Sequence, residues 1–287
     1  MEKPRPSVQG EVVKGLTIGQ FVERTGVAEG TLRMWERRHG FPTPERLPSG
    51  HRRYSETDIE LVRRVASERA AGMSLAAAIA RVKSFSGTPT SSVYASLRRR
   101  RPDLEPRTLR KPMMIALSHA IEDESLSRAE RPLLFASFQN ERFYRQAQPR
   151  WRELSQPAEL TVVFADFDRF RIPRGGPIEV PVDHGHPLAR EWTVVCCAAD
   201  HAVCLSGWEP PPASSEPGQA RIFESIWSVE PDVVWDAARI CAEIVAAKRP
   251  ELIDPVRERL DSEPGPPTRE QLRLATAITN RMLSYLS

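Results

Sequence analysis

The chain has 287 residues, enough for two domains with separate cores, and its 40% hydrophobic and 28% charged residues exclude a wholly disordered protein. Lys and Arg outnumber Asp and Glu by 21 to 12 in residues 1–110, whereas acidic residues outnumber basic ones by 26 to 20 in residues 111–287. A basic first third with an acidic remainder indicates an anion-binding module joined to a part that does not bind polyanions.

No segment is typical of export or of membrane insertion. Residues 1–15 lack the apolar stretch of a secretory signal. No apolar run approaches the roughly 18–20 residues that span a bilayer. The four cysteines have no regular framework spacing, which favours reduced thiols. We therefore expect a cytoplasmic protein with no membrane partner.

Residues 1–85 are predicted to form one compact helical domain. Two short helices flank the turn "TGVAEG", because apolar residues recur on both sides of it at helical spacing. Ser55 followed by Asp58 is typical of a helix start, and a fourth helix is expected to begin at Ser74. The apolar faces of these helices are expected to share one core, with Trp35 as a packing residue rather than a base-stacking one.

Positive charge is concentrated on the second short helix and on the loop after it. Glu29, Arg33 and Arg37 follow one another at four-residue spacing, a pattern that a solvated helix face with a surface salt bridge also shows. Phosphate binding needs several fixed positive groups. Because three prolines stiffen the loop, we expect helix and loop to contact DNA side by side, with the loop folded as a wing. The further cations are Arg38, His39, Arg46, His51, Arg52 and Arg53.

Residues 16–82 resemble the winged helix-turn-helix of MerR-type bacterial transcription regulators. The resemblance rests on an ordered set of motifs, "TGV" in the turn, "LR" in the second helix, "GHRRYS" in the wing and "GMSL" at the fourth helix. It implies that Arg33 enters the major groove, that the wing arginines hold phosphates, that Tyr54 braces the base of the wing and that Glu36 pins the wing or an arginine. The DNA-binding residues expected on this basis are Thr17, Thr31, Arg33, Arg37, Arg38, Arg46, His51, Arg52, Arg53 and Tyr54.

Residues 86–111 are rich in arginine, proline and small polar residues, which is typical of a linker. The regulators that the chain resembles form dimers through a long coiled-coil helix at this place, and the segment has no apolar heptad pattern. The resemblance implies double-stranded DNA as a partner, a homodimer or a dimer formed on DNA, and RNA polymerase as a further candidate partner.

From residue 112 onward, helix-like and strand-like runs alternate. We predict a mixed, mostly antiparallel sensory domain over residues 112–261 and a C-terminal amphipathic helix over residues 266–287, so the fold class is α+β. The predicted strands are 133–138, 160–167, 178–182, 192–199, 202–208 and 221–229, and the predicted helices are 113–126, 141–155, 231–248 and 268–286.

Residues 113–250 resemble the DICT domain, a sensory module found beside such DNA-binding domains. The matching motifs include "LSHAIEDE", "LLFASFQ", "CLSGWE" and "RIFESIWSVEPDVV". The resemblance implies that a signal is sensed, by way of a possible small-molecule effector. Polar or amphipathic residues inside apolar runs are candidates to line a ligand pocket, although Trp192 is also typical of a core aromatic, and Arg221 with Glu224 of an ion pair. These candidates are Glu122, Gln139, Trp192, Arg221 and Glu224.

The cysteines raise the alternative of a metal sensor. Cys196, Cys197 and Cys204 lie near three histidines, and thiolate with imidazole suits zinc or copper. No paired ligand spacing is present, and adjacent cysteines on a strand face opposite sides, so buried reduced thiols are favoured and no metal is assigned.

The sequence contains no phosphate-binding glycine loop, nucleophile elbow or ordered acid/base pair, so we expect neither an enzyme nor a cofactor. The predicted function is a sequence-specific transcription regulator whose DNA binding responds to a signal or small ligand received by the C-terminal domain. The alternative is a DNA-tethered regulator that senses a metal through Cys and His or binds a partner protein.

Overall fold

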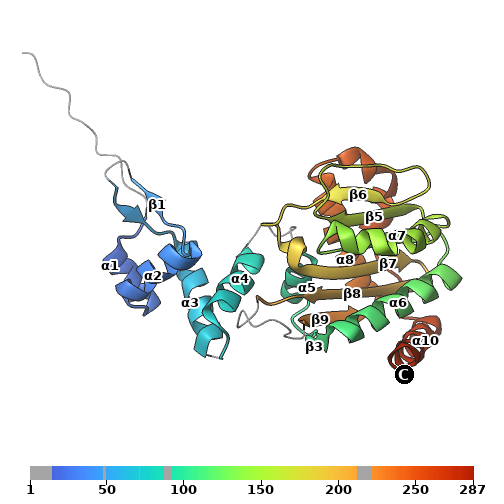
Figure 1. The fold of residues 1–287 in the computed structure, drawn as a ribbon, viewed down its shortest axis with the longest axis horizontal. Coiled ribbons are helices and arrows are strands. Elements are labelled where there is room, and N and C mark those ends of the chain that lie inside the picture. Colours follow the sequence, from blue (N-terminus) through green and yellow to red (C-terminus); the bar gives the residue numbers. More distant parts are fainter. Residues whose placement is uncertain (1–14, 48–49, 71, 87–91, 212–220) are drawn as a thin grey trace, which may run out of the picture. The chain divides into compact units, whose positions relative to one another are not determined.

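The computed structural model in Figure 1 describes residues 15–47, 50–70, 72–86, 92–211 and 221–287. The chain divides into two compact units, Met1–Lys83 and Ser84–Ser287. Among the described residues, none of the helices combines the length and the apolar character that a membrane span requires.

The described part of the first unit is built from four helices, and side chains cap the starts of the first, the third and the fourth. The Thr17 hydroxyl accepts from the Gln20 backbone N–H at 3.4 Å. Ser55 Oγ accepts from the Asp58 N–H at 3.1 Å while Asp58 accepts from the Ser55 N–H at 2.8 Å, so the predicted helix start at Ser55 is confirmed. Gly26 turns the chain between the first two helices at φ 71°. The helices are α1 (Ile18–Thr25), α2 (Glu29–His39), α3 (Glu56–Ala70) and α4 (Leu75–Ser86).

One apolar core joins these helices to a small wing. The wing consists of β1 (Glu45–Arg46) and β2 (Arg52–Arg53), which pair antiparallel. Trp35 is 5% exposed and packs in the core, as predicted. Part of the predicted wing turn, Pro48 and Ser49, lies outside the described residues.

The second unit contains a seven-stranded sheet. Four of the six neighbouring pairs are antiparallel, and only β4 with β5 and β5 with β6 run parallel among the described strands, so the predicted mostly antiparallel α+β fold is confirmed. Every predicted strand is present within two residues of its expected bounds. The strand order is β3 (Arg107–Arg110), β9 (Ile222–Ser228), β8 (His201–Trp208), β7 (Glu191–Ala198), β4 (Leu133–Ser137), β5 (Leu160–Ala165) and β6 (Ile178–Pro181).

Helices cover both faces of this sheet (Figure 1). On one face, α6 (Lys111–Arg128), α7 (Glu141–Ser155) and α10 (Arg269–Leu286) share a buried core with inward residues of the central strands. On the other face, α8 (Pro231–Ala246) lies against β7 and β8 with α5 (Val93–Arg100) beside it. The remaining short helices are η1 (Pro187–Arg190), η2 (Pro250–Leu252), η3 (Asp254–Val256) and α9 (Arg257–Asp261).

The predicted linker over residues 86–111 is wrong for most of its length. Val93, Tyr94 and Leu97 are at most 1% exposed and hold α5 in the second unit. Arg107–Arg110 pairs with β9 as an edge strand of the sheet. The edge strand β3 has no local signal because it is stabilised by its pairing with β9. The start of α5 does have one, since the Ser92 hydroxyl accepts from the Ala95 N–H at 2.9 Å, but the arginine-rich and proline-rich composition around it concealed this cap. Residues 87–91 of the predicted linker lie outside the described part of the chain.

Candidate nucleic-acid interface and ligand pocket

The exposed side of α2 carries the predicted recognition cations. Arg33, Arg37 and Arg38 are exposed, and the Arg33 side chain is 62% exposed. Arg33 forms an ion pair with Glu29, which is the surface salt bridge considered from the sequence. An exposed pair of this kind contributes little free energy and is screened by salt, so it leaves Arg33 able to exchange Glu29 for a phosphate or a base edge.

Glu36 connects α2 to both strands of the wing. Its carboxylate accepts from Arg46 Nη2 at 3.0 Å and from Arg52 Nε at 2.9 Å. The hydrogen bond from Arg52 to Glu36 raises the pKa of Arg52. The prediction that Glu36 pins the wing is confirmed, and its side chain fixes the positions of two of the predicted phosphate-binding arginines.

Tyr54 braces the wing from inside the core. Its ring is 2% exposed and stacks on Phe21 with centroids 4.1 Å apart. Its backbone forms two hydrogen bonds with Leu16, of 2.8 and 3.0 Å. Burial raises the pKa of Tyr54. The ring therefore has the predicted bracing role, and a contact of Tyr54 with DNA stays a prediction.

The other predicted contacts differ in exposure. Thr17 is exposed and caps α1, Thr31 is half-buried on α2, and His51 is exposed at the start of the second wing strand. Arg53 is half-buried and donates to the Arg52 carbonyl oxygen at 3.0 Å. Most of the predicted cations thus lie on α2 or on the two strands of the wing.

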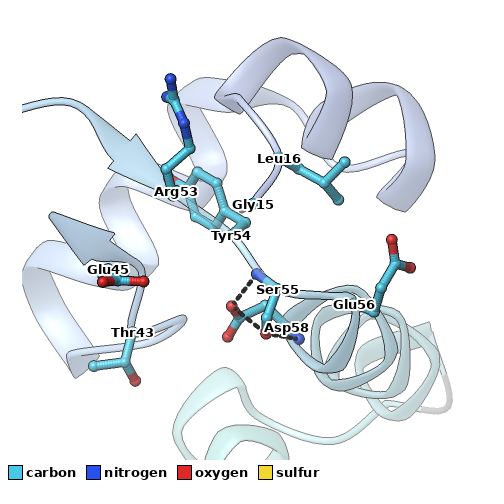
Figure 2. Close-up of a pocket in the computed structure, with 9 residues that line it drawn as sticks. All are labelled: Gly15, Leu16, Thr43, Glu45, Arg53, Tyr54, Ser55, Glu56 and Asp58. Atoms are coloured by element: carbon cyan, nitrogen blue, oxygen red, sulfur yellow. Dashed lines mark hydrogen bonds between the residues drawn. The ribbon is translucent and has the colours of Figure 1, made fainter. Parts of the chain in front are cut away.

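A hollow of about 580 Å³ lies beside the wing, and Figure 2 shows its lining. Three of its side chains are carboxylates, Glu45, Glu56 and Asp58. Asp58 caps α3, and Glu56 is paired with Arg24 at 2.5 Å. The lining also includes Arg53 of the wing, so the hollow has mixed charge and is no strongly anionic or cationic site.

The second unit contains a pocket of about 330 Å³. Its walls come from α6, α7, the end of β4 and the start of β7, and its volume lies in the range of roughly 300–1,000 Å³ that small-molecule sites occupy. Four of the five predicted ligand residues line it, namely Glu122, Gln139, Trp192 and Arg221.

Glu224, the fifth candidate, does not line the pocket. It accepts a hydrogen bond from the Tyr94 hydroxyl of α5 at 3.0 Å. Its predicted alternative role, an ion pair with Arg221, stays a prediction, and Arg221 donates to Glu209 Oε1 and Oε2, each at 2.6 Å. Gln139 Nε2 donates to the same carboxylate at 2.8 Å. Glu209 was missed, although it directly follows a predicted strand in the quoted motif "CLSGWE".

Aromatic and polar groups meet in this pocket. Trp192 Nε1 donates to Ser118 Oγ at 2.9 Å. Phe143 is 40% exposed, with Lys111 Nζ 5.8 Å from its ring centroid. Burial raises the pKa of Glu122 to about 7, while Arg150, whose Nε lies 2.5 Å from the carboxylate, opposes that shift. The arrangement suits a small ligand with an apolar body and a few polar groups.

The cysteines are all buried and free. Burial raises the pKa of Cys196 and of Cys204 to about 12, so both remain thiols at neutral pH. His201 is also buried, and its Nε2 lies 3.1 Å from Ser125 Oγ. Within the described ranges, no three His, Cys, Asp or Glu side chains are grouped as a metal site.

Family comparisons match both units. Residues 16–84 match the MerR HTH family of regulatory proteins. Residues 90–210 match DICT, described as a sensory domain in diguanylate cyclases and two-component systems.

Two curated relatives match part of the chain. One is the HTH-type transcriptional repressor CarA of Myxococcus xanthus, 47% identical over 70 residues, which are 24% of this chain and 24% of the relative. The other is the mercuric resistance operon regulatory protein of Serratia marcescens, 38% identical over 63 residues, which are 22% of this chain and 44% of the relative. The chain therefore matches less than half the length of either relative.

Proposed function

We propose that this chain, which carries a MerR-type helix-turn-helix domain and a DICT sensory domain, is a DNA-binding transcription regulator controlled by a small ligand. The first unit reads double-stranded DNA, and the pocket of the second unit receives the ligand. A protein that acts on the chromosome works in the cytoplasm, which is the location we propose.

The observation that carries the proposal is the joint placement of cations on α2 and the wing. Arg33, Arg37 and Arg38 are exposed on one helix, and Glu36 holds Arg46 and Arg52 beside that helix. A recognition helix with a flanking basic wing supplies base contacts and phosphate contacts at once. Fixed cations also release condensed counterions from DNA without a large loss of side-chain entropy.

Selection of duplexes from a random library with the full chain tests this function. We expect enrichment of one sequence, with an affinity for it at least about 1,000-fold above that for unrelated duplexes, as specific regulators show. Recovery of unselected sequences with uniform affinity would contradict sequence-specific regulation.

A ligand for the second unit is supported by the pocket and by the sensory family that residues 90–210 match. Its aromatic walls provide apolar contact, and Gln139, Ser118 and Arg221 in the same lining provide groups for hydrogen bonding. Mass spectrometry of small molecules released from the denatured full chain tests this part. We expect a molecule that is retained by the wild type and lost when Trp192→Ala opens the pocket wall.

We also propose that the regulator binds DNA as a homodimer or dimerises on it. Support comes from the family resemblance, because two-fold operators are read by two copies of one recognition helix. Sedimentation of the full chain with and without the selected duplex measures the number of copies bound.

A further inference from the structure

The start of α5 is attached to the sheet through one buried carboxylate. Glu191 is 0% exposed. It accepts from the Ser92 hydroxyl, from the Val93 N–H at 3.0 Å and from the Tyr94 N–H at 3.3 Å. These donors all belong to the first turn of α5 or to its N-cap, so Glu191 supplies acceptors that the helix itself cannot provide.

Glu191 is also joined to the ligand pocket. The next residues of β7, Trp192 and Thr193, line the pocket. Ser137, which lines the pocket from β4, donates its hydroxyl hydrogen to the Glu191 carbonyl oxygen at 3.0 Å. One residue therefore contacts α5 through its side chain and a pocket residue through its backbone.

The chemistry makes this attachment sensitive to small displacements. In the described part of the chain, Glu191 has no lysine or arginine partner, so its carboxylate depends on the three donors of α5 for solvation. Loss of these donors would leave a buried polar group without hydrogen-bond partners, which is costly whether Glu191 is ionised or protonated, so docking of α5 is favoured while the three hydrogen bonds last. Since α5 is the first described helix after α4, its docking sets where the chain enters the second unit.

We infer that Glu191 latches α5 to the sheet, and that a pocket occupant loosens the latch by drawing the Ser137 hydroxyl away from the Glu191 carbonyl oxygen. The inference rests on the proposed function, because it states how an effector in the pocket acts on the segment that leads from the DNA-binding unit. A ligand shifts such an equilibrium only if it interacts differently with the two states, and competition for the Ser137 hydroxyl supplies that difference.

Amide hydrogen exchange in the full chain, without DNA or added ligand, tests the latch directly. Ser137→Ala reproduces the loss of the hydroxyl that an occupant would cause, and Glu191→Ala removes the latch itself. Both variants are expected to raise exchange at Val93 and Tyr94 by about fivefold or more, the effect of one lost hydrogen bond. Glu191→Gln keeps a carbonyl acceptor for these amides and is expected to stay within about twofold of the wild type.

Gln146→Ala is the matched control, because Gln146 lines the same pocket without a hydrogen bond to Glu191 among those described. Its exchange at Val93 and Tyr94 should equal that of the wild type. Unchanged exchange in Ser137→Ala overturns the inference, even if Glu191→Ala has an effect. If Glu191→Ala does not fold, the comparison of amide exchange at Val93 and Tyr94 between Ser137→Ala and Gln146→Ala decides whether the inference holds. Because no DNA is used, this failure is distinct from a failure to bind DNA, which would count against the proposed function.

Discussion

At the residue scale, Glu36 has two opposing effects on the proposed DNA-binding surface. It orients Arg46 and Arg52 through hydrogen bonds of 3.0 and 2.9 Å. It also places a negative charge beside cations that are proposed to meet phosphates. Orientation matters most for a specific site, whereas net charge dominates binding to any duplex.

Glu36→Gln should therefore separate the two kinds of binding. We expect tighter binding to unrelated duplexes, with a steeper dependence on salt, because one negative charge is removed. Affinity for the selected sequence should gain less or fall, because Arg52 loses a charge-assisted hydrogen bond that positions it. Fluorescence anisotropy with both duplexes measures the ratio, and an unchanged ratio would show that Glu36 has no positioning role.

Arg33 is the residue proposed to enter the major groove. Arg33→Ala should weaken binding to the selected duplex by about 1–3 kcal/mol while affecting unrelated duplexes less. Arg69→Ala is the matched control, since it removes the same charge from the exposed end of α3. Equal losses in the two variants would reduce the role of Arg33 to general electrostatics.

At the element scale, the sequence was informative wherever an element carries its own signal. Ser55 with Asp58 marks the start of α3, and two apolar runs mark the strands β7 and β8, which pair antiparallel. Of the missed elements, β3 depends on its pairing with the distant strand β9, which no local pattern shows. The other, α5, has a local cap in Ser92, but its polar and arginine-rich sequence is also typical of a linker. The pocket residues were predicted one by one from separate segments, but the sequence does not show that they lie together. It also does not show that Glu209 is the residue that accepts from Arg221.

The C-terminal helix α10 is an element whose role in the second unit can be measured. Ile278 is 0% exposed in the core shared with α6, whereas Leu272 is 71% exposed. Ile278→Ala should lower the free energy of unfolding of the second unit by about 2–4 kcal/mol. Leu272→Ala should change it by less than about 0.5 kcal/mol, and equal effects in urea denaturation would contradict the packing of α10 on this core.

At the scale of the whole molecule, buried carboxyl groups give the stability of the second unit a pH dependence. Burial raises the pKa of Glu191 and of Glu122 from 4.5 to about 7. Between pH 4.5 and about 7 the folded state holds protons that the unfolded state has released. The stability that these protons contribute is therefore present at low pH and lost as pH rises through 7. His201, whose pKa burial lowers to about 4, acts in the opposite direction below its ordinary value.

Glu191→Gln measures the contribution of one carboxyl group to this pH dependence, since it removes the titrating group and keeps a hydrogen-bond acceptor. The stability of this variant relative to the wild type should rise as pH increases from about 5 to about 8, because only the wild type then ionises a buried carboxyl. Urea denaturation of both proteins at several pH values provides the comparison. A constant difference across this range would contradict the raised pKa.

The proposed regulator depends on rigidly placed cations on α2 and the wing to bind duplex DNA. The most direct measurement is the affinity of the full chain for the selected duplex as a function of salt, for the wild type and for the variant with Arg33, Arg37 and Arg52 changed to glutamine. We predict a linear fall of log affinity with log salt concentration, and a slope about three units shallower in the variant. Equal slopes in the two proteins, or no binding by the folded wild type at low salt, would contradict the account.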